Sequence, residues 1–279
     1  MKTAEFYRGI SLPEEAIELL EKVKDTDEKE MKVLFQNNRE VFYKNILKRE
    51  NPWLSFLYYY SQMACDTWEE YKKRGISEKI YWDTFSDFTI WCQNCKEETG
   101  EYGLRQYEWL FRHIDMTLFR LGRLQFEAFP SEWNLTYGEY TIKKGEDVIY
   151  VHIPQGAPLA KVECEKSFKE AFSMFGKEKA YICHSWLLGP ELSEILGENS
   201  NIGKFRSFFH VVFWDYETRE AEERIFKMVQ DNVSLYQETT SLQRAAKKFL
   251  MEGGRLGNGV GILKENCLNC TEKIKKSKK

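Results

Sequence analysis

The chain has 279 residues, 42% of them hydrophobic, and a formal net charge of −3. This length allows one large or two modest hydrophobic cores, and the near-balanced charge argues against a dedicated nucleic-acid binder. No apolar run approaches the roughly 18 residues needed to span a bilayer, and the first residues lack the apolar core of a signal peptide. We therefore expect a cytoplasmic protein that has no membrane contact and keeps its seven cysteines mainly as reduced thiols.

The first half of the chain predicts helices. From Leu12 to Phe126, apolar residues recur at helical spacing over long segments. Asn51-Pro52 and residues 73–77 carry the Pro and Gly signals that separate one helix from the next. We predict that Phe129-Pro130 closes the last helix, and we place an all-helical N-terminal domain at residues 1–128.

The second half predicts a mixed α/β domain at residues 129–266. Its strand-like runs are residues 135–142, 148–153, 181–188, 208–214 and 259–263, and its helical segments lie near 161–175 and 241–252. Residues 217–230 are ambiguous, because a Glu-rich start favours helix and an apolar end suits a strand; we predict a strand. Residues 267–279 form a basic tail that we expect to be disordered. The predicted fold class is α+β.

The most informative segment is residues 148–159, where a strand of the buried type reaches Pro154, turns at Gly156 and leads into a helix. Pro154 has no N–H group, so strand pairing fails there on one side and a ligand with its own amides can occupy that edge. The turn then presents backbone N–H groups at a helix start, where phosphate is favoured.

Two cysteine pairs, Cys92 with Cys95 and Cys267 with Cys270, have the inner spacing of a four-thiolate zinc site. The first pair lies in a helical pattern and the second begins the predicted tail, so we predict no metal site.

Several motifs occur together in a fixed order, which is more specific than any one of them. They are residues 74–77 (RGIS), 121–126 (LGRLQF), 152–154 (HIP), 183–188 (CHSWLL), 200–202 (SNI) and 240–244 (TSLQR). In this order, across roughly residues 68–263, the chain resembles a bacterial two-domain acyltransferase family. Its members join a helical N-acyltransferase N-terminal domain to a GNAT-like C-terminal domain.

The resemblance implies that acyl-CoA or acetyl-CoA is the co-substrate. It implies that the backbone N–H of Ile153 faces the oxyanion and that pyrophosphate lies over Gln155, Gly156, Ala157 and Leu159. The segment departs from the usual superfamily pattern, because it has one glycine and Pro158 removes a donor. The resemblance also implies that Asn201 contacts the pantetheine arm; alternatively, Ser200 and Asn201 cap a helix or turn. Phe205 and Phe208 stand where a Tyr acid is expected, which leaves the general acid unassigned.

Transfer to an amine requires a base, because the amine is mostly protonated at neutral pH. His184 and His152 are the candidates, since both lie on the two strands expected to diverge around the thioester. Each is alternatively a structural histidine that hydrogen-bonds a neighbouring strand or loop. Glu127 is a third candidate, or else an exposed carboxylate at a domain junction. Arg123 and Glu127 are possible acceptor contacts.

The sequence thus predicts an acyl-CoA-dependent N-acyltransferase that moves an acetyl or other acyl group to a small-molecule or peptide amine. A non-catalytic protein that senses acyl-CoA or binds a partner on the same fold is the alternative.

Overall fold

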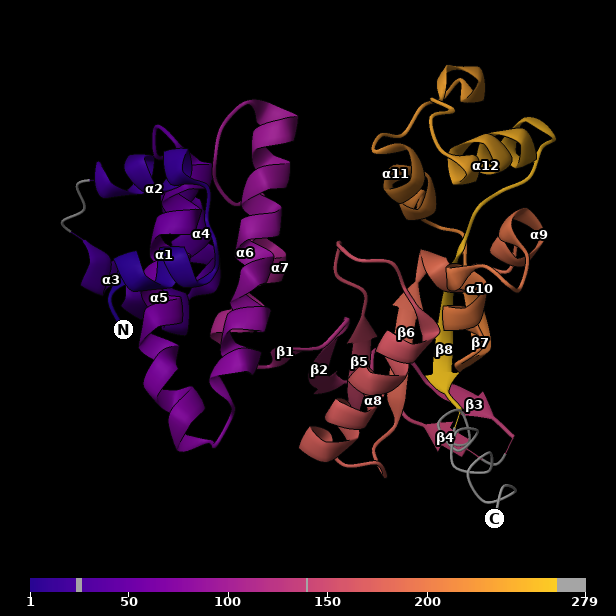
Figure 1. The fold of residues 1–279 in the computed structure, drawn as a ribbon, viewed down its shortest axis with the longest axis horizontal. Coiled ribbons are helices and arrows are strands. Elements are labelled where there is room, and N and C mark those ends of the chain that lie inside the picture. The colour runs from indigo at the N-terminus through magenta and orange to yellow at the C-terminus, as the bar shows by residue number, and fades with distance from the viewer. Residues whose placement is uncertain (24–26, 139, 265–279) are drawn as a thin grey trace, which may run out of the picture. The chain divides into compact units, whose positions relative to one another are not determined.

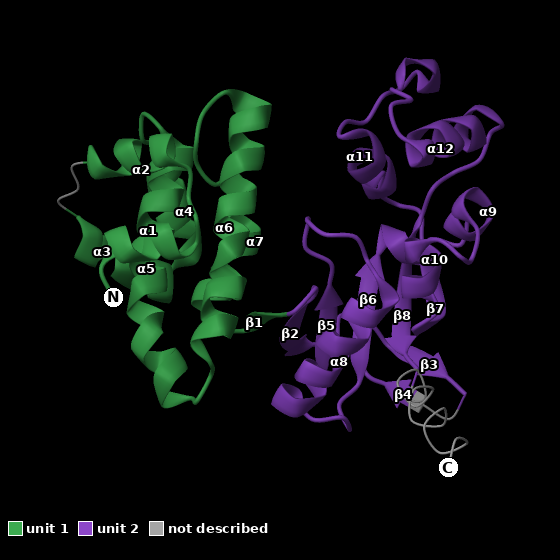
Figure 2. Ribbon diagram, in the orientation of Figure 1, with its two compact units in different colours: residues 1–121 green, residues 122–279 purple. Residues whose placement is uncertain are grey.

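The computed structural model describes residues 1–23, 27–138 and 140–264. The chain divides into two compact units, residues 1–121 and residues 122–279 (Figure 2). The predicted tail at residues 267–279 lies outside the described residues. None of the described helices combines the length and the apolar character that crossing a bilayer requires.

Unit 1 is helical up to its last few residues (Figure 1). In chain order its elements are α1 (Thr3–Gly9), α2 (Glu14–Glu21), α3 (Glu28–Asn37), α4 (Arg39–Leu47), α5 (Pro52–Lys73), α6 (Glu78–Thr99), α7 (Tyr107–Ile114) and β1 (Leu118–Leu121). The sequence signals explain where the long helices begin and end. The Asn51 side chain accepts a hydrogen bond from the N–H of Leu54 at the start of α5, and Ser77 caps α6 in the same way. Gly100 ends α6 at φ 81°.

Aromatic side chains fill the core of unit 1. Phe42, Phe56, Tyr60 and Phe85 have no exposed surface, and the rings of Phe56 and Tyr107 stack with their centroids 4.0 Å apart. Large rings bury the most apolar area per residue, so the aromatic residues in this half of the chain stabilise the packing of α5 against its neighbours.

The prediction of helix up to Phe126 and of a helix end at Phe129-Pro130 was wrong. Residues 118–121 form β1, and residues 124–130 form β2 (Leu124–Pro130), the first strand of unit 2. Between them Gly122 adopts φ 66°, a left-handed conformation that breaks a helix and permits a tight turn.

Unit 2 is built on a mixed sheet. Its further strands are β3 (Leu135–Tyr137), β4 (Tyr140–Ile142), β5 (Asp147–His152), β6 (Tyr181–Ser185), β7 (Phe209–Asp215) and β8 (Asn258–Leu263). Within unit 2 the strand order is β2-β5-β6-β8-β7, in which β5 and β6 are parallel and the other neighbours are antiparallel. β3 and β4 pair separately as a hairpin. The expected strand at 135–142 is therefore two strands, and the other expected strands lie close to their predicted positions.

The two faces of this sheet have different covers. Helix α8 (Lys161–Phe175) packs on one face, where Phe168 contacts Phe126 of β2 with ring centroids 5.8 Å apart. On the opposite face, Leu135 and Ile142 of the hairpin form a core with Tyr150 and Ile182. We call this second face the hairpin face.

Shorter helices follow β6, namely η1 (Trp186–Leu188), α9 (Leu192–Leu196) and α10 (Asn201–Arg206). Segment η1 lies against β8, and this contact explains a glycine. A Cβ atom at Gly259 would stand 2.5 Å from the carbonyl oxygen of Leu188, so any larger residue would push η1 off the strand.

Between β7 and β8 the chain forms a small helical insertion with α11 (Glu220–Phe226), η2 (Val233–Leu235) and α12 (Ser241–Met251). The strand predicted within residues 217–230 is therefore wrong. Ala221, Ile225 and Phe226 of α11 pack on Ala246 and Leu250 of α12. These contacts bury one face of α11 at helical spacing, which overrides the strand preference of its apolar end.

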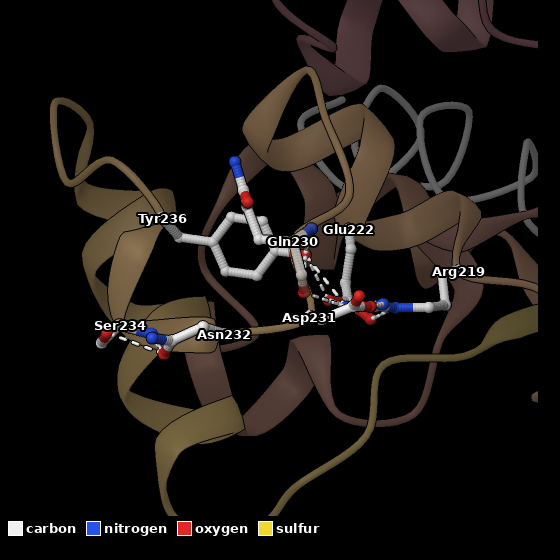
Figure 3. A network of polar contacts seen from close by, with 7 residues as sticks. All are labelled: Arg219, Glu222, Gln230, Asp231, Asn232, Ser234 and Tyr236. Carbon is white, nitrogen blue, oxygen red and sulfur yellow. Dashed lines mark hydrogen bonds and ion pairs between the residues drawn. The ribbon is translucent and has the colours of Figure 1, made fainter.

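A polar network joins the start of α11 to residues on both sides of η2 (Figure 3). Arg219 donates two hydrogen bonds to the carboxylate of Glu222, at 2.8 and 2.6 Å, and the Tyr236 hydroxyl donates to the same carboxylate at 2.5 Å. The Arg219 bond holds the pKa of Glu222 below its usual value. Further along, the TSLQR motif is the start of α12, where Thr240 and Gln243 form a capping box.

Candidate active site

The two parallel strands β5 and β6 separate towards their carboxyl ends. Their ladder contains Ile149 opposite Tyr181 and Tyr150 opposite Ile182. Beyond these pairs β5 continues to His152 beside β2, whereas residues 183–185 of β6 pair with β8. The divergence that the sequence predicts therefore begins directly after Tyr150 and Ile182.

Polar side chains gather on the hairpin face at this divergence. Tyr150 and Ile182 belong to the core on that face, and side chains alternate along a strand, so His152 and His184 project to the same side. Strand β2 adds two more residues, because Gln125 is opposite His152 and Glu127 is opposite Tyr150 in the antiparallel ladder.

His152 and Glu127 form a close pair. The Nε2 atom of His152 lies 2.9 Å from Oε2 of Glu127, whose residue is only 4% exposed. Glu127 was expected at the end of a helix, but it lies on β2, and the strand register brings it to His152. A buried carboxylate that holds one ring nitrogen fixes the orientation of the imidazole and stabilises the cation that forms on protonation. The reading of Glu127 as an exposed junction residue is wrong.

The Tyr150 ring lies nearly parallel to that of His152, with centroids 6.1 Å apart. Its hydroxyl accepts a hydrogen bond from the N–H of Glu132 at 2.9 Å. Burial raises the pKa of Tyr150, so its hydroxyl stays neutral over the physiological range. Tyr150 therefore supports the imidazole from the side, a role that no sequence motif indicated.

His184 has different surroundings. Its ring meets that of Trp133 edge to face, with centroids 5.0 Å apart. Its Nε2 atom is buried and has no hydrogen-bond partner among the described residues. Because a buried polar atom is costly to leave unpaired, this nitrogen is a place where a ligand atom would be stabilised.

The loop after β5 leads to the start of α8. Gln155, Gly156 and Ala157 are exposed, Leu159 is buried, and Ile153 directly follows the last residue of the strand. Gly156 has φ 139°, a conformation that favours glycine. Helix α8 begins at Lys161, and its N-cap residue Ala160 offers no side-chain cap. No side chain therefore caps the backbone N–H groups of this first turn, and that of Glu163 donates to the carbonyl oxygen of Ala160 at 3.0 Å.

Arg123 shapes this loop. Its Nε atom donates to the carbonyl oxygen of Ala157 at 2.6 Å and its Nη1 atom donates to that of Pro154 at 2.8 Å. Its backbone N–H donates to the hydroxyl of Ser167 on α8 at 2.8 Å. Arg123 was expected near an acceptor; the structure shows that it ties the loop to β2 and α8. In the sequence, the LGRLQF motif singled out the segment that contains Arg123. The spacing of the motif did not show which residues Arg123 contacts.

The remaining predicted residues lie on and around α10. Ser200 is its N-cap and accepts a hydrogen bond from the N–H of Gly203 at 2.9 Å, which confirms the capping interpretation for Ser200. Asn201 is the exposed first residue of the helix. Phe205 and Phe208 are buried and contact each other and the α8 core, so neither stands where a proton donor would meet solvent or ligand.

Cys92 and Cys95 lie buried on α6, and burial raises the pKa of the Cys92 thiol to about 12. Cys267 and Cys270 lie outside the described residues. Within the described parts of the chain, no group of three or more His, Cys, Asp or Glu residues is arranged to hold a metal ion.

Comparisons with known proteins agree with this architecture. Residues 1–116 match the N-acyltransferase N-terminal domain, and residues 118–263 match the GNAT-like C-terminal domain. The chain belongs to this two-domain N-acyltransferase family. The predicted family and the predicted α+β fold class are thereby confirmed.

Solved acyltransferases share the fold of this chain. A structure in complex with decanoyl-CoA and teicoplanin has a TM-score of 0.72 at 19% identity, over 94% of this chain and 87% of that one. A complex with CoA and 10C-teicoplanin has a TM-score of 0.72 at 19% identity, over 95% and 88% of the two chains. A complex with decanoyl-CoA has a TM-score of 0.74 at 18% identity, over 94% and 86%. No curated protein matches the sequence.

Proposed function

We propose that the protein is an acyl-CoA-dependent N-acyltransferase that transfers an acyl group to an amine of a small-molecule or peptide acceptor. The observation that carries this proposal is the pair of His152 and Glu127 at the end of β5. The pair stands where β5 and β6 separate and directly before the exposed loop that leads to α8. The proposed base, the end of β5 where it separates from β6, and the loop to the start of α8 thus follow one another within residues 149–161.

The loop and α8 would bind the CoA moiety. Backbone N–H groups of Gln155, Gly156, Ala157 and Leu159, together with the positive end of the α8 dipole, suit a pyrophosphate. Pro158 contributes no N–H group, so the loop has one donor fewer for the pyrophosphate. The Arg123 hydrogen bonds already hold the loop in place, and CoA binding therefore costs less conformational entropy. Asn201, exposed at the start of α10, is the proposed pantetheine contact.

In the proposed reaction His152 accepts a proton from the acceptor amine. With its Nε2–H directed to Glu127, the neutral ring carries its lone pair on Nδ1, which receives the proton. The amine nitrogen then attacks the thioester carbonyl carbon, the backbone N–H of Ile153 stabilises the oxyanion, and the C–S bond breaks to release the CoA thiolate. The thiolate takes up, directly or through water, the second proton that the nitrogen loses as the amide forms. His184 flanks the same opening from β6 and is the second candidate for proton transfer.

The acyl group is proposed to range from acetyl to medium-chain acyl. The solved acyltransferases of the same fold are complexes with decanoyl-CoA and, in one mutant, octanoyl-CoA. The alternative role as a non-catalytic acyl-CoA sensor is less well supported, because the chain belongs to a family of acyltransferases.

Calorimetric titration with CoA, acetyl-CoA and decanoyl-CoA tests the binding part of the proposal. Gly156→Glu places a charge and a strained side chain in the phosphate loop, and we expect it to abolish binding. Gly145→Glu is the matched control, because Gly145 also has a positive φ, of 88°, with no other atom near its Cβ position. Absence of binding to all three ligands by the wild-type protein would refute the proposal.

Turnover separates an enzyme from a sensor. We expect wild-type protein to release CoA from an acyl-CoA in the presence of amines, and we expect His184→Ala to reduce this release without changing the affinity for CoA. A protein that binds acyl-CoA tightly but releases no CoA with any amine of a broad panel would be a sensor.

A further inference from the structure

Gln125 is a buried glutamine at the start of β2 that the mechanism above does not use. Its residue is 1% exposed, and its Nε2 atom has no hydrogen-bond partner among the described residues. Most buried side-chain amides in folded proteins are paired, because an unpaired one loses its bonds to water without replacement. A buried Nε2 atom that has no partner among the described residues therefore points to a hydrogen-bond acceptor supplied by a ligand.

The position of Gln125 indicates which ligand that is. In the β2–β5 ladder Gln125 stands directly opposite His152, so the two side chains leave the same face of the sheet from neighbouring strands. The thioester opening lies on the other side of His152, between β5 and β6. Gln125 thus lies on the β2 side of His152, and the proposed thioester opening lies on the β6 side.

We propose that the Nε2–H group of Gln125 donates a hydrogen bond to an oxygen of the acyl acceptor. This inference rests on the proposed N-acyltransferase function and narrows its substrate class. With the amine at His152 and the oxygen at the neighbouring Gln125, the oxygen belongs on the carbon next to the amine-bearing carbon or on a group attached there. The preferred acceptors are amino amides, amino acid units of peptides and amino sugars, and simple alkylamines are poor acceptors.

Matched pairs of amines test this. L-Phenylalaninamide and 2-phenylethylamine differ by one carboxamide, and glucosamine and cyclohexylamine differ by ring and hydroxyl oxygens. Release of CoA from decanoyl-CoA is measured with each amine for wild type and Gln125→Met, which keeps an unbranched chain and removes the amide. Differences in basicity between the amines are the same for both proteins, so the change in the ratio of kcat/KM values reports the role of Gln125.

We expect Gln125→Met to lower the preference for the oxygen-bearing amine of at least one pair about tenfold, the effect of one lost hydrogen bond. Its affinity for decanoyl-CoA stays unchanged, and its Tm does not fall, because the Nε2 atom of Gln125 has no hydrogen-bond partner among the described residues. Gln243→Met is the control for a structural amide. The Gln243 side chain donates to the carbonyl of Ile225 at 3.0 Å and belongs to the capping box, so this variant loses Tm and keeps the preference.

Three results would overturn the inference: an unchanged preference in both pairs, a weaker affinity for decanoyl-CoA, or a Tm loss as large as that of Gln243→Met. The first leaves the proposed function standing, because turnover itself persists. The second assigns the amide to the CoA arm, and the third makes it structural. If wild-type protein acylates none of the four amines, the inference fails together with the amine-acceptor part of the proposed function.

Discussion

Replacing Glu127 by Gln tests the central pair of the proposed site. The substitution keeps the shape of the side chain and removes the charge that faces His152 across 2.9 Å. If His152 becomes a cation during the reaction, Glu127 stabilises that state more than the neutral one, and the variant loses this difference. We therefore expect a lower rate with little change in acyl-CoA affinity.

The size of the effect follows from the burial of the pair. Two unit charges about 4 Å apart attract by about 4 kcal/mol at an effective dielectric constant of about 20. The side chain of His152 is 22% exposed and that of Glu127 is 5% exposed. Because solvent screens the partly exposed His152, we take about half of this attraction, or about 2 kcal/mol. A loss of this size corresponds to a fall in kcat/KM of about 30-fold.

The assay is the initial rate of thiol release from decanoyl-CoA with the best amine acceptor. Glu132→Gln is the matched control, because it removes an exposed carboxylate of the same unit and should leave the rate unchanged. The double variant Glu127→Gln/His152→Gln should be no slower than His152→Gln alone, since the two residues act as one unit. A Glu127→Gln rate within threefold of wild type would refute the role of this carboxylate.

Two further predictions concern the loop and the insertion. Arg123→Met removes both donors to the loop carbonyls, so we expect the CoA affinity measured by calorimetry to fall about fivefold to tenfold. The control is Arg224→Met, which replaces an exposed arginine. Equal losses of CoA affinity in both variants would contradict the role of Arg123. Because Arg219 lowers the folded-state pKa of Glu222, the stability from this pair is complete above the unfolded-state value of about 4.3 and is lost as pH falls through the folded-state pKa. Glu222→Gln should therefore cost about 2 kcal/mol in the free energy of unfolding by urea at pH 7 and much less at pH 3, and a gap independent of pH would contradict this.

Local signals in the sequence located many of the elements but not their pairing. The bounds of α8 follow from an apolar stripe that ends at Gly176, and most strands were found from short apolar runs. The segment from Leu118 to Phe126 was predicted as helix because its apolar residues also fit helical spacing. The left-handed turn at Gly122 decides in favour of two strands.

The site shows the same limit. His152 and His184 were recognisable as candidates because few residues titrate near neutral pH. The contact of His152 with Glu127 depends on the antiparallel register between β2 and β5, and so does the placement of Gln125 opposite His152. A register that brings residues 25 positions apart into contact is a long-range property, set by the packing of a whole sheet face, and one sequence does not reveal it.

The place of β8 in the sheet has a consequence for synthesis of the chain. Residues 258–263 form the last of the described strands along the sequence, yet β8 pairs with both β6 and β7 and lies between them. Until these residues leave the ribosome, β6 and β7 have no hydrogen-bond partner on the edges that face each other. Strand β6, which carries His184, therefore cannot take its final place in the sheet. The sheet of unit 2 is therefore completed only after residue 263 has been synthesised, and a premature stop before residue 258 would yield a protein with unpaired strand edges that favour aggregation.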